Sequence, residues 1–496
     1  MIRVHRANGL VPLGYRFKTM LDRTLGRLGA KIAVVLLVAL AKKGQATNAP
    51  SSSSRPVAAQ GWESAAGAET TTVFALTGDT TINRRLSTFR GPGVDDLFGL
   101  VRKADVAFTN LETLIHDFTL PGAQETGGTY MGSPRWIADE LAWAGFDLLA
   151  LANNHANDYG VEGMRSTVAA LSRNTNLVYA GVGENLALAR KPGYLDTPKG
   201  RVALISVSST FPPPIIAGAQ RKDMPGRPGL NPLRHTLTYT VPQSTYDTIA
   251  ALRGPINQDM GDVESAPLAF HGAQYVVGNK IKISSKANEH DIRELQASIR
   301  NARQQSDWVV VSLHAHEAAD PTDLRMPAEF VIESARAMID AGADVVVGHG
   351  PHILRGIEVY KGKPIFYSLG NFIFETDLVE LQPADSYELW GLDGDSLPSD
   401  YFNKRSKNDT ARFSADRRCW QSVVAEVLYD NNRTLQEVRL HPVSMGFGQP
   451  RLRRGRPYPS PANETQQIFD DLKDASAAFG TSVSYENGVG KLLWIG

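Results

Sequence analysis

One pattern recurs along the chain from residue 71 onward and limits the folds that are open to it. A short run of β-branched and apolar residues ends in a cluster of polar side chains, and a segment with helical periodicity follows. The pattern is found at residues 72–79, 104–112, 146–155, 307–317 and 343–352. Apolar runs of this kind suit strands that are buried on both faces. Strand–helix alternation in turn favours an α/β protein with parallel strands and right-handed crossovers.

The segments between these runs carry helix signals. Residues 133–145 begin with a capping Ser133 and with Pro134 at the first helical position, and Gly145 stands where a helix commonly ends. Similar periodic segments occupy residues 163–174, 289–305 and 328–342. We therefore predict that residues 72–376 form a core of alternating strands and helices.

Two parts of the chain depart from this alternation. Residues from about 211 to 288 contain "FPPPII" and several other Pro and Gly residues, which predicts a loop-rich insertion that covers the site. Residues 417–446 predict two strands with hairpin-like spacing, and residues 464–480 predict an amphipathic helix. We therefore assign one domain to residues 71–496, with its C-terminal strands and helix in 417–496.

The first 70 residues differ from the rest. A basic stretch precedes "IAVVLLVALA" (32–41), which has about half of the length that a membrane-spanning helix needs. A basic region followed by a short apolar run is the layout of a signal peptide. We predict a signal or membrane-anchor segment at 1–43 and a linker at 44–70. The protein would then be extracytoplasmic, either secreted or anchored, whereas a basic tail that is not exported is the alternative.

Charge and cysteine content narrow the possible partners. The chain has 52 basic and 52 acidic residues, so its net charge gives no reason to expect a nucleic-acid partner. The single cysteine, Cys419, excludes an internal disulfide framework and a cysteine-rich metal site. Any metal ion must therefore be held by His, Asp, Glu and Asn side chains.

The polar clusters suggest such a site. In open α/β sheets, ligands collect beyond the carboxyl ends of the strands, and every cluster lies at that end of its predicted strand. We expect the polar residues to meet at a single rim of one sheet. Carboxylates, an amide oxygen and imidazoles without thiols suit Zn²⁺, Mn²⁺ or Fe²⁺ at a hydrolytic centre. The set comprises Asp79, Glu112, Asn154, His155, His314, His349 and His352. Taken alone, each of these residues has a simpler role, such as a helix cap, a turn or an ordinary hydrogen bond.

The chain also resembles the bacterial capsule-synthesis (CapA-like, poly-γ-glutamate) family of the calcineurin-like metallophosphatase superfamily. The matching stretches include "LTGDTTINRR", "VAFTNLET", "LALANNHANDYG", "VVVSLHAHE" and "GADVVVGHGPHILRG", within residues 74–375. The resemblance implies a four-layer αββα sandwich and one or two divalent metal ions. It implies metal ligands at Asp79, Asn154, His314, His349 and His352, with Glu112 as a bridging carboxylate. It also implies an acid or oxyanion-stabilising role for His155, and it places Arg84 near a basic position that would meet an anionic substrate.

Three departures from the superfamily pattern affect this expectation. Thr81 stands where the superfamily usually has a histidine, and Gly350 and Pro351 separate two histidines that one residue usually separates. The first two departures weaken one of the two metal positions. His316 adds a second imidazole after His314, and of the two we assign the ligand role to His314.

Two functions follow from the residues and the resemblance. The first is a metal-dependent hydrolase with a phosphoesterase-type site, acting in capsule or poly-γ-glutamate biosynthesis on a phosphoester or an acidic polymer. The second is a non-catalytic, membrane-tethered accessory that binds an acidic polymer and helps to assemble or export it with membrane partners of capsule synthesis. The basic segment "RLRRGR" (451–456) fits the second function. Acid–base chemistry by Asp and His without a metal is a less favoured third use of the site.

Overall fold

The computed structural model describes residues 71–256, 267–320 and 322–494. The predicted signal or anchor segment and the linker, residues 1–43 and 44–70, lie outside the described residues. Within the described part, no helix has the length and apolar character needed to cross a bilayer.

The first of two main sheets has ten strands and contains the earliest part of the described chain. Its order is β25-β26-β23-β22-β1-β2-β5-β6, with β21 beside β1 and β24 beside β23. The strands β1, β2, β5, β6 and β21 are parallel, and β22 runs antiparallel to β1. The bounds are β1 Thr71–Thr81, β2 Val106–Leu111, β5 Leu148–Ala150, β6 Val178–Ala180, β21 Asn371–Phe374, β22 Gln421–Asp430, β23 Leu435–Ser444, β24 Tyr458–Pro459, β25 Thr481–Glu486 and β26 Val489–Trp494.

The second main sheet has six strands in the order β19-β20-β18-β15-β9-β8. Its four central strands, β20, β18, β15 and β9, are parallel, and an antiparallel strand closes each edge. The bounds are β8 Gly193–Thr197, β9 Gly200–Ser208, β15 Trp308–His314, β18 Val345–His349, β19 Ile357–Tyr360 and β20 Lys363–Phe366.

Side-chain alternation along the strands separates three apolar cores. In β1, Phe74 and Leu76 face the core between the two sheets, whereas Ala75 faces the helices outside the first sheet. In β15, Val310 faces the same central core, whereas Val309 faces the helices outside the second sheet. Both faces of each sheet are therefore buried, which explains why these strands are continuous apolar runs in the sequence.

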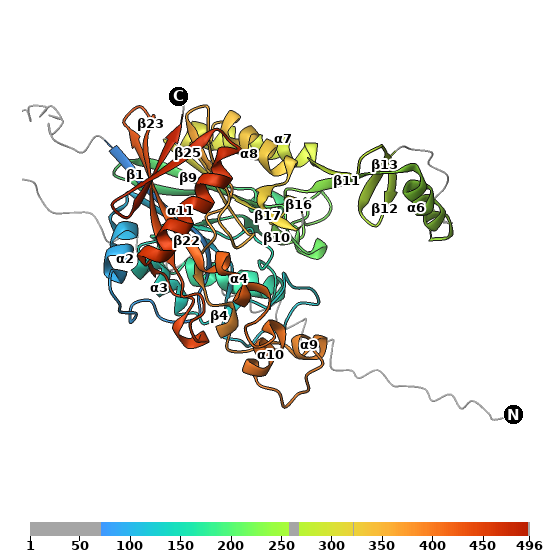
Figure 1. The fold of residues 1–496 in the computed structure, drawn as a ribbon, viewed down its shortest axis with the longest axis horizontal. Coiled ribbons are helices and arrows are strands. Elements are labelled where there is room, and N and C mark those ends of the chain that lie inside the picture. The colour runs from blue at the N-terminus through green and yellow to red at the C-terminus, as the bar shows by residue number, and fades with distance from the viewer. Residues whose placement is uncertain (1–70, 257–266, 321, 495–496) are drawn as a thin grey trace, which may run out of the picture. The chain divides into compact units, whose positions relative to one another are not determined.

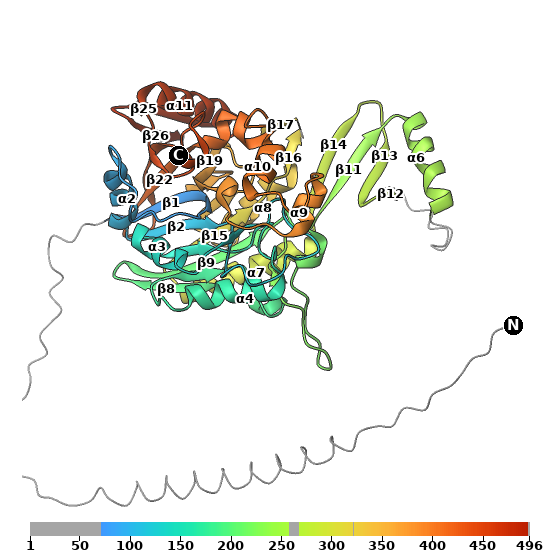
Figure 2. The same ribbon diagram turned by 90° about the horizontal axis from the view of Figure 1, so that it is seen from below.

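The helices complete four layers, α, β, β and α, as expected from the resemblance (Figures 1 and 2). The outer helices of the first sheet are α2 Val94–Lys103, α3 Ile137–Ala144 and α4 Gly160–Leu171, and those of the second sheet are α7 Glu289–Gln305 and α8 Glu329–Asp340. The C-terminal helix α11, Ala462–Ala477, packs its buried face against the central core. The predicted α/β class and the four-layer sandwich are thus confirmed.

The predicted loop-rich insertion is wrong in part, because half of it has regular structure. Residues 235–287, here called the arm, form a four-stranded sheet in the order β12-β13-β11-β14 with one helix. The bounds are β11 His235–Val241, α6 Gln243–Ile256, β12 Leu268–Phe270, β13 Ala273–Val277 and β14 Lys282–Ala287. In β11, polar and apolar residues alternate as expected of a half-buried strand, a pattern that the neighbouring Pro and Gly residues obscured.

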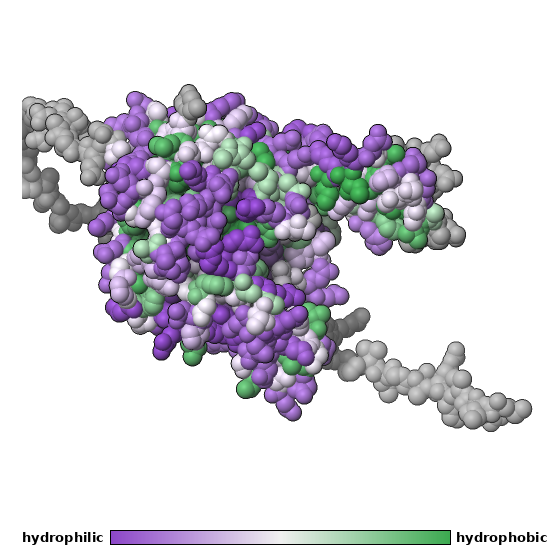
Figure 3. Space-filling model, viewed as in Figure 1, coloured by the Kyte–Doolittle hydropathy of each residue, from purple (hydrophilic) through white to green (hydrophobic). Residues whose placement is uncertain are grey.

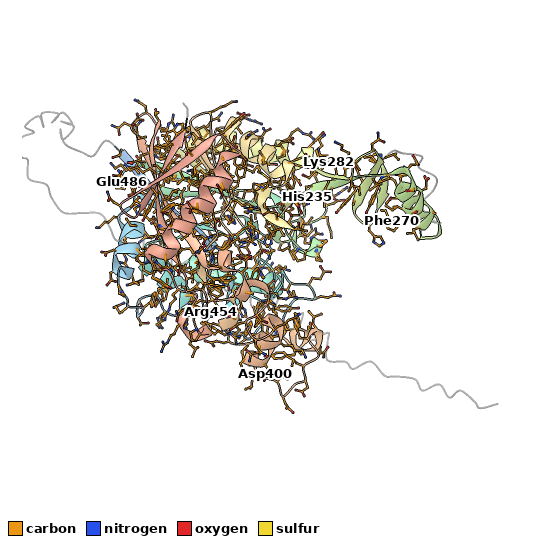
Figure 4. The ribbon with its side chains drawn as sticks, in the orientation of Figure 1. His235, Phe270, Lys282, Asp400, Arg454 and Glu486 are labelled. Carbon is orange, nitrogen blue, oxygen red and sulfur yellow. The ribbon has the colours of Figure 1, made fainter. Side chains whose placement is uncertain are left out.

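The arm stands out from the sandwich in both ribbon views and does not lie across it (Figures 1 and 2). His235 lies at the junction, where its ring stacks on Phe330 with centroids 4.4 Å apart, and Phe270 lies further out (Figure 4). The surface view shows a mostly hydrophilic face with separate apolar patches, one of them on the arm (Figure 3). Val277 and Ile281 are among its exposed apolar residues.

The predicted C-terminal hairpin is present as the antiparallel pair β22–β23, and the predicted helix is α11. Shorter elements complete the fold. They are β3 Leu114–Ile115, β4 Gly132–Ser133, β7 Val182–Gly183, α5 Leu186–Ala189, η1 Pro213–Ile215, β10 Gly229–Leu230, β16 Ala318–Asp320, β17 Asp323–Pro327, η2 Thr376–Leu378, α9 Ala384–Leu389, α10 Pro398–Ser406, η3 Arg412–Ala415, η4 Arg417–Trp420 and η5 Arg451–Arg453.

Candidate metal centre

The polar residues predicted to form a site meet where the carboxyl ends of both main sheets come together. In the first sheet, Asp79 at the end of β1 is directly opposite Asn110 in β2. In the second sheet, His314 at the end of β15 is directly opposite His349 at the end of β18. We expected one rim of one sheet, and this is wrong: two packed sheets contribute. Their parallel strands end on the same side of the sandwich, so the clusters still meet.

Asp79 is fully buried and held by two donors. Its Oδ1 accepts a hydrogen bond from Asn110 Nδ2 at 2.8 Å, and its Oδ2 accepts one from the backbone N–H of Gly350 at 3.0 Å. The preceding Gly78 lies so close to β21 that an added Cβ would overlap the carbonyl oxygen of Gly370. Only glycine therefore lets β1 deliver Asp79 at this point.

Four histidines line the other side of the cluster. His314 Nδ1 lies 3.0 Å from His349 Nδ1, and His314 Nε2 lies 3.0 Å from His316 Nε2. His349 Nε2 lies 2.6 Å from Ser312 Oγ, and His352 Nδ1 lies 2.9 Å from Asn371 Oδ1. A contact this short between two ring nitrogens requires that at least one of the two rings is neutral, because one nitrogen must accept.

Burial keeps these rings neutral. It lowers the pKa of His349 to about 3 and that of His352 to about 4. Burial, followed by the neighbouring imidazoles, lowers the pKa of His314 and His316 well below the ordinary value. The neutral imidazole is the form that binds metal ions.

The turn after β18 explains the two histidines around a Gly-Pro pair. Gly350 has a positive φ of 116°, and a Cβ there would lie 2.8 Å from His316 Cδ2. His352 also adopts a positive φ, 60°, which is uncommon for a residue with a side chain. The turn thus brings a backbone N–H to Asp79 and returns a second imidazole to the same cluster.

Glu112 is the most unusual member. Both carboxylate oxygens are buried without a hydrogen-bond donor, and they lie 3.8 Å from His314 Nε2 and 3.9 Å from His352 Nδ1. Burial and the nearby Asp79 carboxylate raise the pKa of Glu112 well above its ordinary value. Burial also raises the pKa of Asp79 to about 7, against the hydrogen bonds from Asn110 and Gly350.

No lysine or arginine of the described residues pairs with either carboxylate. Their ion-pair contacts within 4.0 Å are all to histidines, and these histidines have lowered pKa values. Two buried carboxylates facing neutral imidazoles leave negative charge uncompensated, which is costly in a protein interior. A divalent cation would compensate that charge and satisfy the free oxygens.

Three overlapping groups of side chains offer ligand atoms within 4.8 Å of one another. They are Asp79–His314–His349, Glu112–His314–His316 and Asp79–Glu112–His352. Asp79, Glu112, His314, His349 and His352 thus come together as predicted. His316, which we ranked below His314, lies in the cluster as well.

Asn154 is placed next to this cluster by the loop after β5. Its Nδ2 donates to the carbonyl of Gly127 at 3.1 Å, and its Oδ1 is buried without a donor. An amide oxygen in that condition is available to a cation. Asn154 therefore fits the ligand role that the resemblance implies.

His155 is fixed by an acidic residue that the sequence analysis missed. Its Nδ1 lies 2.6 Å from Asp158 Oδ2, and Asp158 also accepts hydrogen bonds from Thr126 and from the backbone N–H groups of Gly127 and Met131. With this carboxylate at Nδ1, the proton of the neutral ring resides there and Nε2 is left free. A carboxylate three residues after the histidine, in "HAND", was the available signal.

Arg84 does not join the cluster. Its guanidinium binds Glu375 at 2.7 Å and the backbone carbonyls of Leu452 and Arg454 at 2.6 Å. It therefore ties the start of the chain's core to the C-terminal region, and its contacts give no support to a substrate role.

Part of the basic segment 451–456 also forms ion pairs within the protein. Arg451 and Arg454 pair with Asp377 and Asp409. Two of the four arginines in "RLRRGR" are thus compensated within the protein.

Comparisons with known proteins agree with this geometry. The sequence model of the family described as "Bacterial capsule synthesis protein PGA_cap" matches residues 73–376, which contain every residue of the cluster. The uncharacterised protein y4sH of Sinorhizobium fredii is 36% identical over 424 residues, 83% of this chain and 91% of that protein.

Two relatives have more informative names but cover less of the chain. The capsule biosynthesis protein CapA of Bacillus anthracis is 32% identical over 233 residues, 47% of this chain and 41% of that protein. The PGA biosynthesis protein CapA of Bacillus subtilis is 30% identical over 270 residues, 54% of this chain and 49% of that protein. The chain thus aligns with less than half of each of these two proteins.

Proposed function

The chain belongs to the bacterial capsule synthesis protein family, and from this we propose that it is a metal-dependent hydrolase acting in capsule or poly-γ-glutamate biosynthesis. The substrate would be a phosphoester or an acidic polymer. The observation that carries the proposal is the pair of buried carboxylates, Asp79 and Glu112, which face neutral imidazoles and form no ion pair with a lysine or arginine of the described residues.

Asp79, Glu112, Asn154, His314, His349 and His352 would hold one or two divalent cations. Their oxygen and imidazole donors suit Mn²⁺, Zn²⁺ or Fe²⁺. When bound, such a cation supplies Lewis-acid polarisation of a substrate oxygen and lowers the pKa of a coordinated water.

The protein's own groups supply orientation and a proton. Asp158 receives the Nδ1–H of His155, which fixes the ring and leaves Nε2 as the atom that gives or takes a proton. His155, when Nε2 carries a second proton, would give that proton to the leaving group and return to the neutral ring, a role that commonly contributes about 10²–10⁴ in rate. Asn110 holds Asp79 through one hydrogen bond and contacts Asn153 through another, so the first sheet positions its ligands rigidly.

A non-catalytic accessory remains the second candidate because of one observation. Thr81, at the position where the superfamily usually has a histidine, hydrogen-bonds through Oγ1 to the backbone carbonyl of Ile373 at 3.2 Å. One metal position therefore lacks a ligand, and a single cation would then serve structure while the protein binds an acidic polymer. Tethering outside the membrane through residues 1–43, and contact with capsule-synthesis membrane partners, belong to this candidate.

The test uses the full-length protein and measures metal content and turnover together. The wild type should bind at least one equivalent of Mn²⁺, Zn²⁺ or Fe²⁺ and hydrolyse a phosphoester or a γ-glutamyl peptide. Asp79→Ala and His349→Ala should lose both properties. Asp147→Asn is the matched control, since Asp147 is a shielded carboxylate that accepts a hydrogen bond from Ala107 N, outside the cluster.

The outcomes separate the candidates. Metal retained in both ligand variants would remove the assignment of the centre. Metal that is lost in the variants, without turnover by the wild type on any of these substrates, would favour the accessory.

A further inference from the structure

A partly buried guanidinium lies at the metal centre without a counter-ion. Arg405, on α10, has no hydrogen bond and no ion pair with any described residue. Its one defined contact is with the ring of Phe413, whose centroid lies 5.9 Å from the guanidinium carbon. Burying an arginine is unfavourable unless something satisfies its five N–H donors, so a missing partner is informative.

Two sets of distances place this guanidinium near the centre. Arg405 Nη2 and His155 Cε1 each lie 4.0 Å from the position that a Cβ would occupy on Gly128. Phe413, the ring that Arg405 contacts, packs edge-on against His352 with centroids 4.9 Å apart. Arg405 therefore lies between the proton-carrying histidine and one of the metal ligands.

The surrounding segment holds Arg405 in this position. Residues 376–416, here called the cap, carry α9 and α10 and project from the lower right of the sandwich in Figure 1. Tyr401 and Phe402 of α10 pack with Met131 and Val379 in a small core of their own. Met131 is in turn fixed by Asp158, which accepts its N–H at 2.7 Å. The cap is thus coupled to the residue that orients His155.

The nearby acids are already paired with other arginines. Asp377 binds Arg451 and Arg454, and Asp409 binds the same two residues. Arg405 differs from Arg451 and Arg454, because it has no carboxylate partner among the described residues, and it differs from Arg412, which also has none but is exposed.

We propose that Arg405 binds an anionic oxygen of the substrate, from a phosphoryl or carboxylate group, while the same group contacts the metal centre. The inference rests on the proposed function, because it assigns a substrate contact to that site. A cation-loaded centre and an arginine together form a positive pocket, and the planar guanidinium fork matches both anions through two parallel hydrogen bonds. Partial burial strengthens such a contact relative to one in water.

The experiment measures binding without requiring turnover. Full-length protein loaded with Mn²⁺ is titrated calorimetrically with inorganic phosphate and, separately, with a short γ-linked oligoglutamate. Arg405→Gln should weaken binding of at least one anion about ten- to a hundredfold, as expected for a lost charge-assisted contact. Metal content should be unchanged. Lys404→Gln is the matched control, since Lys404 is the exposed neighbour of Arg405 on the same helix. The affinity of this variant for both anions should stay within about twofold of the wild-type value.

Arg405→Lys keeps the charge but loses the fork, so it should weaken binding by less than Arg405→Gln. If far-UV circular dichroism shows that Arg405→Gln does not fold, Arg405→Lys is the variant used in the test. Weaker binding of phosphate alone identifies a phosphoryl group, and weaker binding of oligoglutamate alone identifies a polymer carboxylate.

Equal affinities of wild type and Arg405→Gln for both anions would overturn the proposal, as would no binding by the wild type. The two proposals fail separately. If Arg405→Gln weakens anion binding but the wild type shows no turnover, the hydrolase proposal fails and the proposed Arg405 contact stands. If Arg405→Gln turns over substrate with the wild-type KM, the Arg405 contact fails and the hydrolase proposal stands.

Discussion

Replacing Glu112 by Gln should have opposite effects on stability with and without a metal ion. In the metal-free protein, Glu112 has two buried oxygens without a donor and lies close to Asp79. Gln has nearly the same shape but no charge. The variant should therefore be more stable than wild type in a chelator and less stable than wild type in saturating Mn²⁺. If Glu112 had a purely structural role, Glu112→Gln would be less stable than wild type in both conditions.

The size of the effect follows from the two ways in which Glu112 can exist at pH 8. Ionised, one of its oxygens lies within 4.8 Å of an Asp79 oxygen, and two unit charges at that distance repel by about 3.5 kcal/mol at an effective dielectric constant of 20. If Glu112 is protonated at pH 8, it binds a proton about 3.5 pH units above its ordinary pKa of 4.5, which costs about 5 kcal/mol. Burial adds a desolvation cost to the ionised form, so the penalty in the wild type lies between about 3.5 and 5 kcal/mol.

The amide of Gln must itself find partners, which recovers only part of that penalty. We expect the free energy of unfolding in chelator at pH 8 to rise by about 1–3 kcal/mol in Glu112→Gln. The pH dependence has a definite sign. The pKa of Glu112 is raised on folding, so the wild-type penalty is absent below about pH 4.5 and grows as the pH rises. The gain should therefore vanish near pH 5.

Urea unfolding followed by circular dichroism, at pH 5 and pH 8 with and without Mn²⁺, measures these differences. Mn²⁺ at a thousandfold excess over Kd, bound to the folded state alone, adds about 4.1 kcal/mol, which exceeds the expected gain of the variant. The wild type should gain this stabilisation and the variant should lose most of it. A variant that is less stable than wild type in chelator at pH 8 would refute the account of Glu112 as an uncompensated carboxylate.

Four further variants test other parts of the structure. Gly78→Ala should cost at least about 2 kcal/mol of stability and most of the metal affinity, because the added Cβ would overlap a backbone carbonyl. Gly99→Ala is its control: Gly99 lies in a helix with open space around it, so this change should add about 0.5–1 kcal/mol of stability. Urea unfolding and metal titration check both variants. Asp158→Asn should lower kcat about ten- to a hundredfold with metal content unchanged, because His155 loses the carboxylate at Nδ1; unchanged kcat would contradict that role. Asp147→Asn should stabilise the protein by about 1–2 kcal/mol at pH 8 and by nothing near pH 4, because burial raises the pKa of Asp147 to about 6; a gain that is independent of pH would count against it.

The part of the site that the sequence predicts is the part governed by strand direction. Asp79, His314 and His349 each end a continuous apolar run, and parallel strands bring such ends together without any knowledge of side-chain contacts. The number of sheets does not follow from this rule, since every run is apolar on both faces whether one sheet or two lie at the centre. The resemblance to a sandwich family supplied that choice.

What the sequence does not predict depends on partners that are far apart along the chain. We expected Arg84 to meet an anionic substrate, whereas its guanidinium binds Glu375, which lies 291 residues later in the chain. Arg405 was not singled out, because an arginine between a lysine and a serine on an ordinary helix looks like a solvated side chain. Only the fold shows that the acids near it are already occupied and that His155 and His352 flank it. Pairings between residues that are far apart along the chain, whether made or missing, are properties of the whole fold, and local sequence patterns do not predict them.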